Sequence, residues 1–292
     1  MITVEDNAPA KDKAHSIVAW AIVAALLFLR MALLGAGEMI WKGQNWLEPT
    51  FQVGTYLFTA CLIWWERNRL AEFHIDKLAL AMIILFKPIQ TLILCLWGGG
   101  NNNALAFPKW PSLVIWLISL GLVLALWASR PSLPKLSRDS FNWVGIGILV
   151  GLLEVLLLGY PMALQIGETS MQVEVGFLTI FSWRSLMSFL YQLGYAAVSE
   201  EPLFRGFLWG YLQKAGWKGV WIWLFQAGLF MLGHIYYVNE FPISFWVIVP
   251  AGALVLGGLV WKSKTLSSSM AAHATMNTLG YTVGNIIAAN MR

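Results

Sequence analysis

The sequence predicts an all-α fold, a polytopic bundle of eight or nine transmembrane helices. Of its 292 residues, 58% are hydrophobic and only 12% are charged, about half the charged fraction of an average soluble domain. Apolar runs of about 20 residues recur along the chain, and a helix of that length crosses the roughly 30 Å hydrocarbon core of a bilayer. No soluble domain fits between these runs, and nothing in the composition supports binding of nucleic acid.

Nine candidate spans follow from the apolar runs, with ends that are uncertain by several residues. The connections between them are short. The expected spans cover residues 16–36, 49–65, 77–97, 111–129, 142–163, 186–212, 217–237, 245–261 and 266–289.

The basic residues of the connections alternate in a way that predicts the orientation of the chain. One set of alternate loops holds Lys11, Lys13, Arg67, Arg69, Lys77, Arg130, Lys135, Arg138, Lys214, Lys218, Lys262 and Lys264, and the other set holds Lys42, Lys109, Arg184 and Arg292. Because cytoplasmic loops are enriched in Lys and Arg, twelve against four places the N-terminus in the cytoplasm. We expect a multi-pass protein of a prokaryotic plasma membrane, or of a thylakoid or other organelle membrane.

The chain is expected to have three parts. Residues 1–15 form a polar cytoplasmic N-terminus, and residues 16–140 form N-terminal transmembrane helices of unassigned role. Residues 141–292 form a C-terminal transmembrane core, and the polar motifs lie in its segment 186–290.

Six ionisable side chains remain inside the expected spans, three of each sign, and they are the most costly residues of the sequence. A charge near the bilayer centre costs roughly 2.5–3.5 kcal/mol on insertion scales, so it is a functional-site hypothesis by default. Arg30, Lys87 and Glu154 are interpreted as structural pairs or snorkelling groups. The other three are Glu200, Glu201 and Arg205, which occur close together.

The two carboxylates in the segment Ser199–Arg205 are expected to have different roles. Glu201 and Arg205 are four residues apart with the acid first, which favours an ion pair on one helix face. Glu200 lies about 100° around the helix, beside Phe204, and has no such partner, so it is free for chemistry. Pro202 suggests that a new helical segment begins here, capped by Ser199.

Two histidines follow in later spans, each with a second residue four positions away. Phe230 precedes His234, and Asn277 follows His273. His273 and Asn277 offer two donors on one helix face, which suits an oxyanion in a dry site. His234 is placed to orient a water or to share a proton with Glu200. A single histidine of this kind is more often a hydrogen-bond partner between helices.

Straight spans do not bring these groups together. Measured from the nearer expected span ends at 1.5 Å per residue, Glu200 lies about 18 Å deep, His273 about 12 Å and His234 about 25 Å along its own helix. Tilt, an unwound segment near Pro202 or different span ends must close the gap.

The ordered motifs 200–205, 230–234 and 273–277 resemble the CPBP family, the CAAX prenyl proteases and bacteriocin-processing proteins also called the Abi family. The resemblance covers residues 186–290, and the first four or five spans match no named family. It implies a glutamic intramembrane endopeptidase without a cofactor, acting in the lipid bilayer on a peptide or protein substrate. Prenylated tails, leader peptides and membrane-anchored regulators are all processed by similar proteins.

The resemblance also implies roles for individual residues. Glu200 activates water with help from His234, and His273 and Asn277 form the oxyanion hole. Glu201 and Arg205 occupy positions assigned to positioning the site, and the motif residues Phe204 and Phe230 are expected to support it.

Three alternatives stay open. Glu200, His234 and His273 are the right residue types for a three-ligand zinc site with an open position, although no His-Glu-x-x-His motif occurs. A non-catalytic membrane scaffold or regulator on a protease-like fold would keep the same residues. A small transporter would also explain charged spans, but no matching pair of interrupted helices is found in the two halves.

Overall fold

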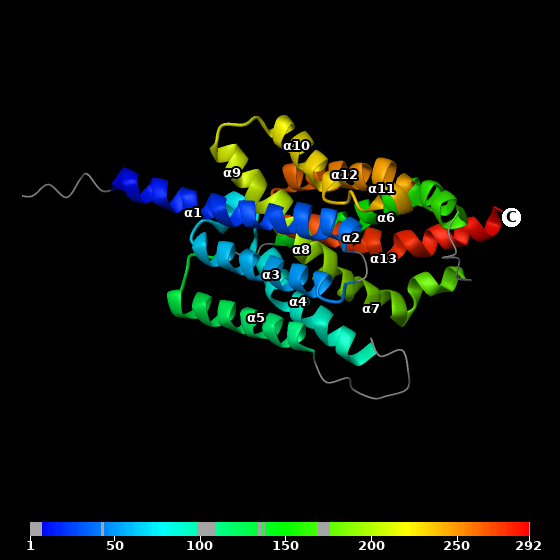
Figure 1. Ribbon diagram of the computed structural model, residues 1–292, viewed down its shortest axis with the longest axis horizontal. Helices are drawn as coiled ribbons and strands as arrows, with labels where there is room; N and C mark the ends of the chain where they lie inside the picture. Colours follow the sequence, from blue (N-terminus) through cyan, green and yellow to red (C-terminus); the bar gives the residue numbers. More distant parts are fainter. Residues whose placement is uncertain are drawn as a thin grey trace, which may run out of the picture.

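The computed structural model describes residues 8–41, 44–97, 109–133, 136, 138–168 and 176–291, and these residues form helices without a strand. The helices run roughly along the long axis of the molecule and pack side by side (Figure 1). α1 starts at one end of the bundle, and α13 finishes at the opposite end. The expected all-α polytopic bundle is therefore confirmed.

The first half of the chain contributes five of the longer elements. α1 (Ala8–Phe28) continues through a π-helical stretch, Leu29–Ala36, into the short α2 (Gly37–Ile40). The elements that follow are α3 (Leu47–Trp65), a 3₁₀ turn (Leu70–Phe73), α4 (Lys77–Trp97), α5 (Trp110–Ser129) and α6 (Arg138–Glu168).

The second half holds the motif-bearing helices. After a 3₁₀ turn (Phe177–Phe181) come α7 (Trp183–Gln192), α8 (Val198–Glu201) and α9 (Trp209–Lys214), joined by π-helical stretches Leu193–Ala197 and Pro202–Leu208. The chain ends with α10 (Gly219–Leu232), α11 (Tyr237–Glu240), a π-helical stretch (Ser244–Ile248), α12 (Val249–Ser263) and α13 (Leu266–Asn290).

Five of the described helices are long and apolar enough to cross a membrane, and a sixth, Gly219–Leu232, is apolar but shorter. The five are Ala14–Ile40, Lys77–Leu96, Trp110–Ser129, Arg138–Ile166 and Ser244–Ser263. The expected spans 49–65, 186–212 and 266–289 are also helical but carry more polar side chains. The count of eight or nine spans therefore includes helices that hydropathy and length alone do not select.

Glycines bring α13 close to α6, and this contact fixes the position of the last motif. A Cβ atom at Gly147 would lie 2.2 Å from the carbonyl oxygen of Ser268, and one at Gly151 would lie 2.6 Å from that of Ala272. Small residues four apart allow such close approach of transmembrane helices. The carbonyl that faces Gly151 belongs to the residue directly before His273.

Candidate active site

The chain stays helical through the Glu200 motif, so Ser199 does not cap a new helix as expected. Residues 183–214 form one helix with two wider, π-helical stretches, and no side-chain cap is formed at this point. Pro202 has no N–H, and its ring crowds the carbonyl one turn earlier in a regular α-helix. The wider turns accommodate Pro202, and such π-helical bulges often occur at functional sites.

Glu201 is fully buried and is held by three donors. Arg205 donates from Nη1 to Oε1 at 3.1 Å, His273 donates from Nδ1 to Oε1 at 2.7 Å, and the Ser269 hydroxyl donates to Oε2. The ion pair expected between Glu201 and Arg205 is therefore present. Since all of its neighbours donate, Glu201 acts as the anchor that fixes His273 on α13 against α8.

The guanidinium of Arg205 is also fixed on its other side. Its Nη2 donates to the carbonyl oxygen of Ala253 at 3.3 Å, and its Cζ lies 4.3 Å from the centre of the Phe230 ring. Phe204 is fully buried and packs edge-on against Phe230, with ring centroids 5.2 Å apart. The two phenylalanines thus pack against each other next to the Arg205 guanidinium.

Glu200 has a partner that the sequence did not indicate, Arg30 from the first helix. Arg30 Nη1 lies 2.8 Å from Glu200 Oε1. The other oxygen, Oε2, has no hydrogen-bond partner among the described residues and lies 3.8 Å from Nε2 of His273. Arg30 therefore forms an ion pair, as one of the two interpretations expected, and its partner is the proposed catalytic carboxylate.

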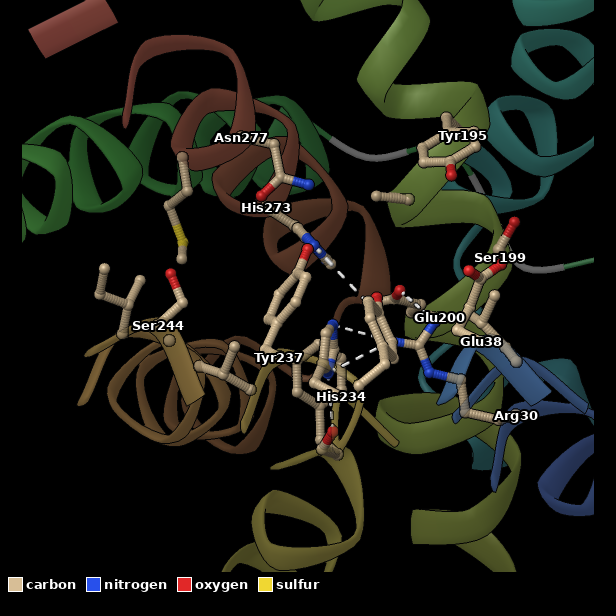
Figure 2. A pocket seen from close by; sticks show the side chains of 18 of the residues that line it. Arg30, Glu38, Tyr195, Ser199, Glu200, His234, Tyr237, Ser244, His273 and Asn277 are labelled. Atoms are coloured by element: carbon tan, nitrogen blue, oxygen red, sulfur yellow. Dashed lines mark hydrogen bonds and ion pairs between the residues drawn. The ribbon is translucent and has the colours of Figure 1, made fainter. Parts of the chain in front are cut away.

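Arg30 also bridges Glu200 to His234 (Figure 2). The ring of His234 donates from Nδ1 to the carbonyl oxygen of Phe230 at 2.8 Å and accepts from Arg30 Nη2 at Nε2, at 2.7 Å. These two contacts assign the proton to Nδ1. His234 is thus aligned with Glu200 through the guanidinium and does not hydrogen-bond to the carboxylate.

The shape of α10 resolves the difference in depth that straight spans would create. The expected span 217–237 is shorter as a helix, because α10 ends at Leu232 and turns follow. His234 lies in these turns, where its backbone N–H donates to the carbonyl of Met231. Because α10 ends early, the turns that follow it place His234 at the depth of Glu200.

Asn277 lies one turn beyond His273 on α13, and both face the same cavity (Figure 2). The Asn277 side chain is exposed, and its Nδ2 donates to Gln192 Oε1 at 3.3 Å. His273 is buried and fixed by the short hydrogen bond to Glu201, whereas the hydrogen bond that holds Asn277 is long. The two expected oxyanion donors thus lie next to each other, but the side chain of Asn277 is held less firmly than that of His273.

One cavity of about 450 Å³ joins the groups from all these helices. Its lining includes Arg30, Glu200, His234, His273 and Asn277, together with polar side chains of α3 and the helix preceding Glu200. All four residues expected to carry out catalysis therefore line a single cavity, and Arg30 is added to them.

The arrangement does not fit the zinc site considered from the sequence. A guanidinium stands between Glu200 and His234, where a metal bound by both would have to lie, and it occupies Nε2 of His234. Over the described ranges, no group of three or more His, Cys, Asp or Glu side chains has the arrangement of a metal site.

Residues 181–279 match the family model of type II CAAX prenyl endopeptidases, described as Rce1-like. The chain carries an Rce1-like segment. This match confirms the family resemblance that the three motifs indicate, and it contains all of them. It supports a membrane-embedded protease, and therefore a hydrolase. No curated protein and no solved structure matches the chain.

Arg30 lies outside the Rce1-like segment, on the first helix of the described chain. One signal in the sequence could have reduced the candidates to two residues. Glu200 is a carboxylate inside a span with no partner on its own helix, and it requires a cation. With Arg205 assigned to Glu201, the remaining cations inside spans were Arg30 and Lys87, and periodicity does not choose between them.

Lys87 makes a different contact, next to the site. Its ammonium donates to Gln52 Oε1 and, at 3.3 Å, to the hydroxyl of Ser199. Gln52 in turn donates to Glu48, which also accepts from the Tyr195 hydroxyl at 2.6 Å. This polar network connects α3, α4 and α8 behind Glu200, and the expected structural role of Lys87 agrees with it.

Proposed function

We propose that this protein is an intramembrane endopeptidase in which Glu200 activates the water that attacks a peptide bond. The observation that carries the proposal is the position of the two Glu200 oxygens. Oε1 is paired with Arg30, whereas Oε2 has no hydrogen-bond partner in the described structure and faces Nε2 of His273 at 3.8 Å. A water bound beside Oε2 would donate a hydrogen bond to this oxygen, which is the contact that a general base needs to take the proton.

The roles of the other groups follow from their partners. Arg30 supplies the counter-charge that a carboxylate needs at this depth and fixes its orientation. Glu201 holds His273 in place, as the orienting acid does in other hydrolytic sites. Asn277, which lines the cavity, is proposed to donate to the oxyanion together with Nε2 of His273, which must then carry a second proton because Nδ1 donates to Glu201.

The reaction can be written as a balanced hydrolysis. Water transfers a proton to Glu200 while its oxygen attacks the carbonyl carbon and gives a tetrahedral oxyanion. The oxyanion collapses, the C–N bond breaks, and the proton held by Glu200 passes to the leaving nitrogen. The first products are a carboxylic acid and an amine, which become a carboxylate and an ammonium when the acid passes its proton to the amine, and Glu200 returns to its starting state.

The substrate class is proposed from the family match and from the location of the cavity. The matched family acts on CAAX prenyl proteins by its description, and the cavity lies among apolar helices. A membrane-associated substrate, such as a prenylated C-terminal tail or a leader peptide, fits both observations.

Comparative proteomics of membrane and secreted fractions tests this function. Cells that produce the wild type are compared with cells that produce Glu200→Gln, and Glu72→Gln serves as a matched control at an exposed ion pair with Lys214. We expect one uncleaved species in Glu200→Gln cells and none in the control. Full processing by an accumulated Glu200→Gln protein would contradict the proposal and favour a non-catalytic scaffold.

A further inference from the structure

A second cavity, of about 300 Å³, opens from the catalytic cavity. The two share lining residues, among them Met162, Tyr195, Met276 and Asn277, so they are continuous at the position of the oxyanion donor. The second cavity is lined by α6 and α13, and Glu154, whose carboxyl oxygens are buried in the wall, is among its lining residues. A substrate group that enters this cavity therefore lies next to the wall that holds Glu154.

Glu154 is 4% exposed, and neither of its carboxyl oxygens has a hydrogen-bond partner among the described residues. His273 and Arg205 act on it electrostatically, but both make their hydrogen bonds to Glu201. A buried carboxyl without partners is costly, and native structures rarely keep one without a use. The interpretation of Glu154 as a member of a structural pair is not supported by any contact in the described structure.

The walls of this cavity define what it can hold. Between Asn277 and Glu154 they are mainly apolar, with Val155, Leu158 and Ile248 among them. An unbranched alkyl chain would contact these walls, and a cation or donor at its end would satisfy both oxygens of Glu154. An acidic group in the same place would meet a carboxyl and no donor to pair with.

We propose that the Glu154 cavity is a substrate subsite for a long basic side chain, in which the alkyl stem lies against α6 and α13 and the cationic end pairs with Glu154. Substrate recognition by the subsite rests on the proposed proteolysis, whereas binding of a basic chain in this cavity does not. Glu154 lies outside the segment matched by the family model, so the subsite would be a specificity feature of this chain's own α6.

The first test measures the site without any cleavage. Dicyclohexylcarbodiimide adds to protonated carboxyls in apolar surroundings, and mass spectrometry of the purified full chain locates the adduct. We expect modification at Glu154, slowed roughly tenfold or more by saturating hexylguanidinium, which stays protonated and does not react with the carbodiimide, and not by hexanol. Glu201, at similar depth but hydrogen-bonded on both oxygens, is the internal control. No adduct at Glu154, or equal protection by the two compounds, would overturn the proposal.

The second test measures selectivity with a reconstituted peptide reporter. The probe is the peptide that accumulates in Glu200→Gln cells, with lysine or its uncharged isostere norleucine placed in turn at each residue near the cleaved bond. At one position we expect the wild type to prefer lysine by roughly ten- to hundredfold in kcat/KM, and Glu154→Gln to lose that ratio. A ratio that Glu154→Gln leaves unchanged would contradict the subsite. If the wild type cleaves no reporter at all, the proposed function fails, while the carbodiimide result still decides the subsite.

Discussion

Arg30 holds two residues of the site at once, since one guanidinium nitrogen meets Glu200 and the other meets His234. Arginine suits this task better than lysine because its planar fork presents several fixed donors, whereas an ammonium is a point charge. The pair is buried on both sides, with side chains 4% and 9% exposed. Removal of one partner therefore leaves an uncompensated charge, and the loss of stability is larger than for a surface pair.

A double-mutant cycle measures this coupling. Arg30→Met should destabilise the chain by about 3–5 kcal/mol, because Glu200 is left buried and unpaired. Adding Glu200→Gln should recover part of that loss while activity stays absent. Thermal unfolding of the purified variants in detergent gives the stabilities. Strictly additive effects of the two changes would contradict a direct pair.

The conservative substitution Arg30→Lys complements this experiment. It keeps the charge but cannot donate to Glu200 and His234 in the same fixed geometry. We expect a protein that accumulates normally and cleaves its substrate at least roughly tenfold more slowly. Cleavage at the wild-type rate would show that only the charge of Arg30 matters.

His74 lies outside the membrane-spanning helices and links the connection between α3 and α4 to the core. Burial lowers the pKa of His74 to about 4, from its ordinary value of 6.5, and the Lys264 ammonium adds to this. Glu72 and Lys214 line the same surface hollow, where they form an ion pair with each other. The imidazole is therefore neutral in the folded protein at neutral pH.

The pKa of His74 predicts a loss of stability in acid. Below pH 6.5 the unfolded chain takes up a proton that the folded ring binds only near pH 4, so folding stability falls as the pH drops through this window, by about 3 kcal/mol at most. His74 has a φ of 58°, which asparagine tolerates. Unfolding temperatures at about pH 7 and about pH 4.5 should therefore differ less for His74→Asn than for the wild type. An unchanged difference would assign the acid sensitivity to other groups.

At the scale of elements, the contact between α6 and α13 determines where His273 lies. α6 presents Gly147 and Gly151 to the backbone of α13, and the residues at that contact precede His273 directly. By contrast, nothing lies within 4 Å of a Cβ atom placed on Gly145. One helix therefore offers a test position and a matched control two residues apart.

Gly147→Ala should push α13 away from α6, because its Cβ would lie 2.2 Å from the Ser268 carbonyl oxygen. The expected cost is about 1–3 kcal/mol in stability, with a loss of activity through displacement of His273. Gly145→Ala should leave stability unchanged or raise it slightly, since alanine favours helix more than glycine does. Equal effects of the two substitutions on unfolding temperature would contradict this packing.

The helix around Glu200 shows which features of an element can be predicted from the sequence and which cannot. The Glu201–Arg205 pair follows from a spacing of four residues, and it is present. The π-helical stretches on either side of α8 do not follow from periodicity, although Pro202 marks the start of the second one. The early end of α10 does not follow from it either, since its apolar pattern continues past Leu232.

At the scale of the whole molecule, three of the described connections that carry basic residues meet at one surface hollow. Lys214 pairs with Glu72, and Lys264 lines the same hollow. Residues from three separate connections are thus neighbours, as the alternation of basic loops predicts. The last helix finishes at the opposite end (Figure 1), so an N-terminus in the cytoplasm places the C-terminus outside.

Cysteine labelling tests this orientation. In a chain without its own cysteines, Gln213→Cys and Asn290→Cys place thiols at exposed positions near the two ends. An impermeant maleimide added to intact cells should label Asn290→Cys and should label Gln213→Cys only after permeabilisation. The reverse pattern would invert the predicted topology.

The sequence predicted the fold class and the ordered motifs, because hydropathy and short-range spacing encode both. It did not predict Arg30 as the partner of Glu200, or the open carboxyl of Glu154, because each depends on contacts between helices far apart in the chain. From the sequence, the charged side chains inside spans could be divided into structural and catalytic groups only by their sign and spacing. The structure shows that two of the three set aside in that way, Arg30 and Glu154, lie at the proposed site.

The most direct measurement of a catalytic role for Glu200 is hydrolysis by the purified chain in proteoliposomes. The wild type, Glu200→Asp and Glu200→Gln are compared on the peptide that accumulates in Glu200→Gln cells, with unfolding temperature as the check of folding. Glu200→Asp keeps the charge that Arg30 requires but withdraws the carboxylate by one methylene. We predict that Glu200→Gln lowers kcat by at least roughly a hundredfold and that Glu200→Asp is folded and slow. Cleavage by folded Glu200→Gln at the wild-type rate would contradict water activation by this carboxylate.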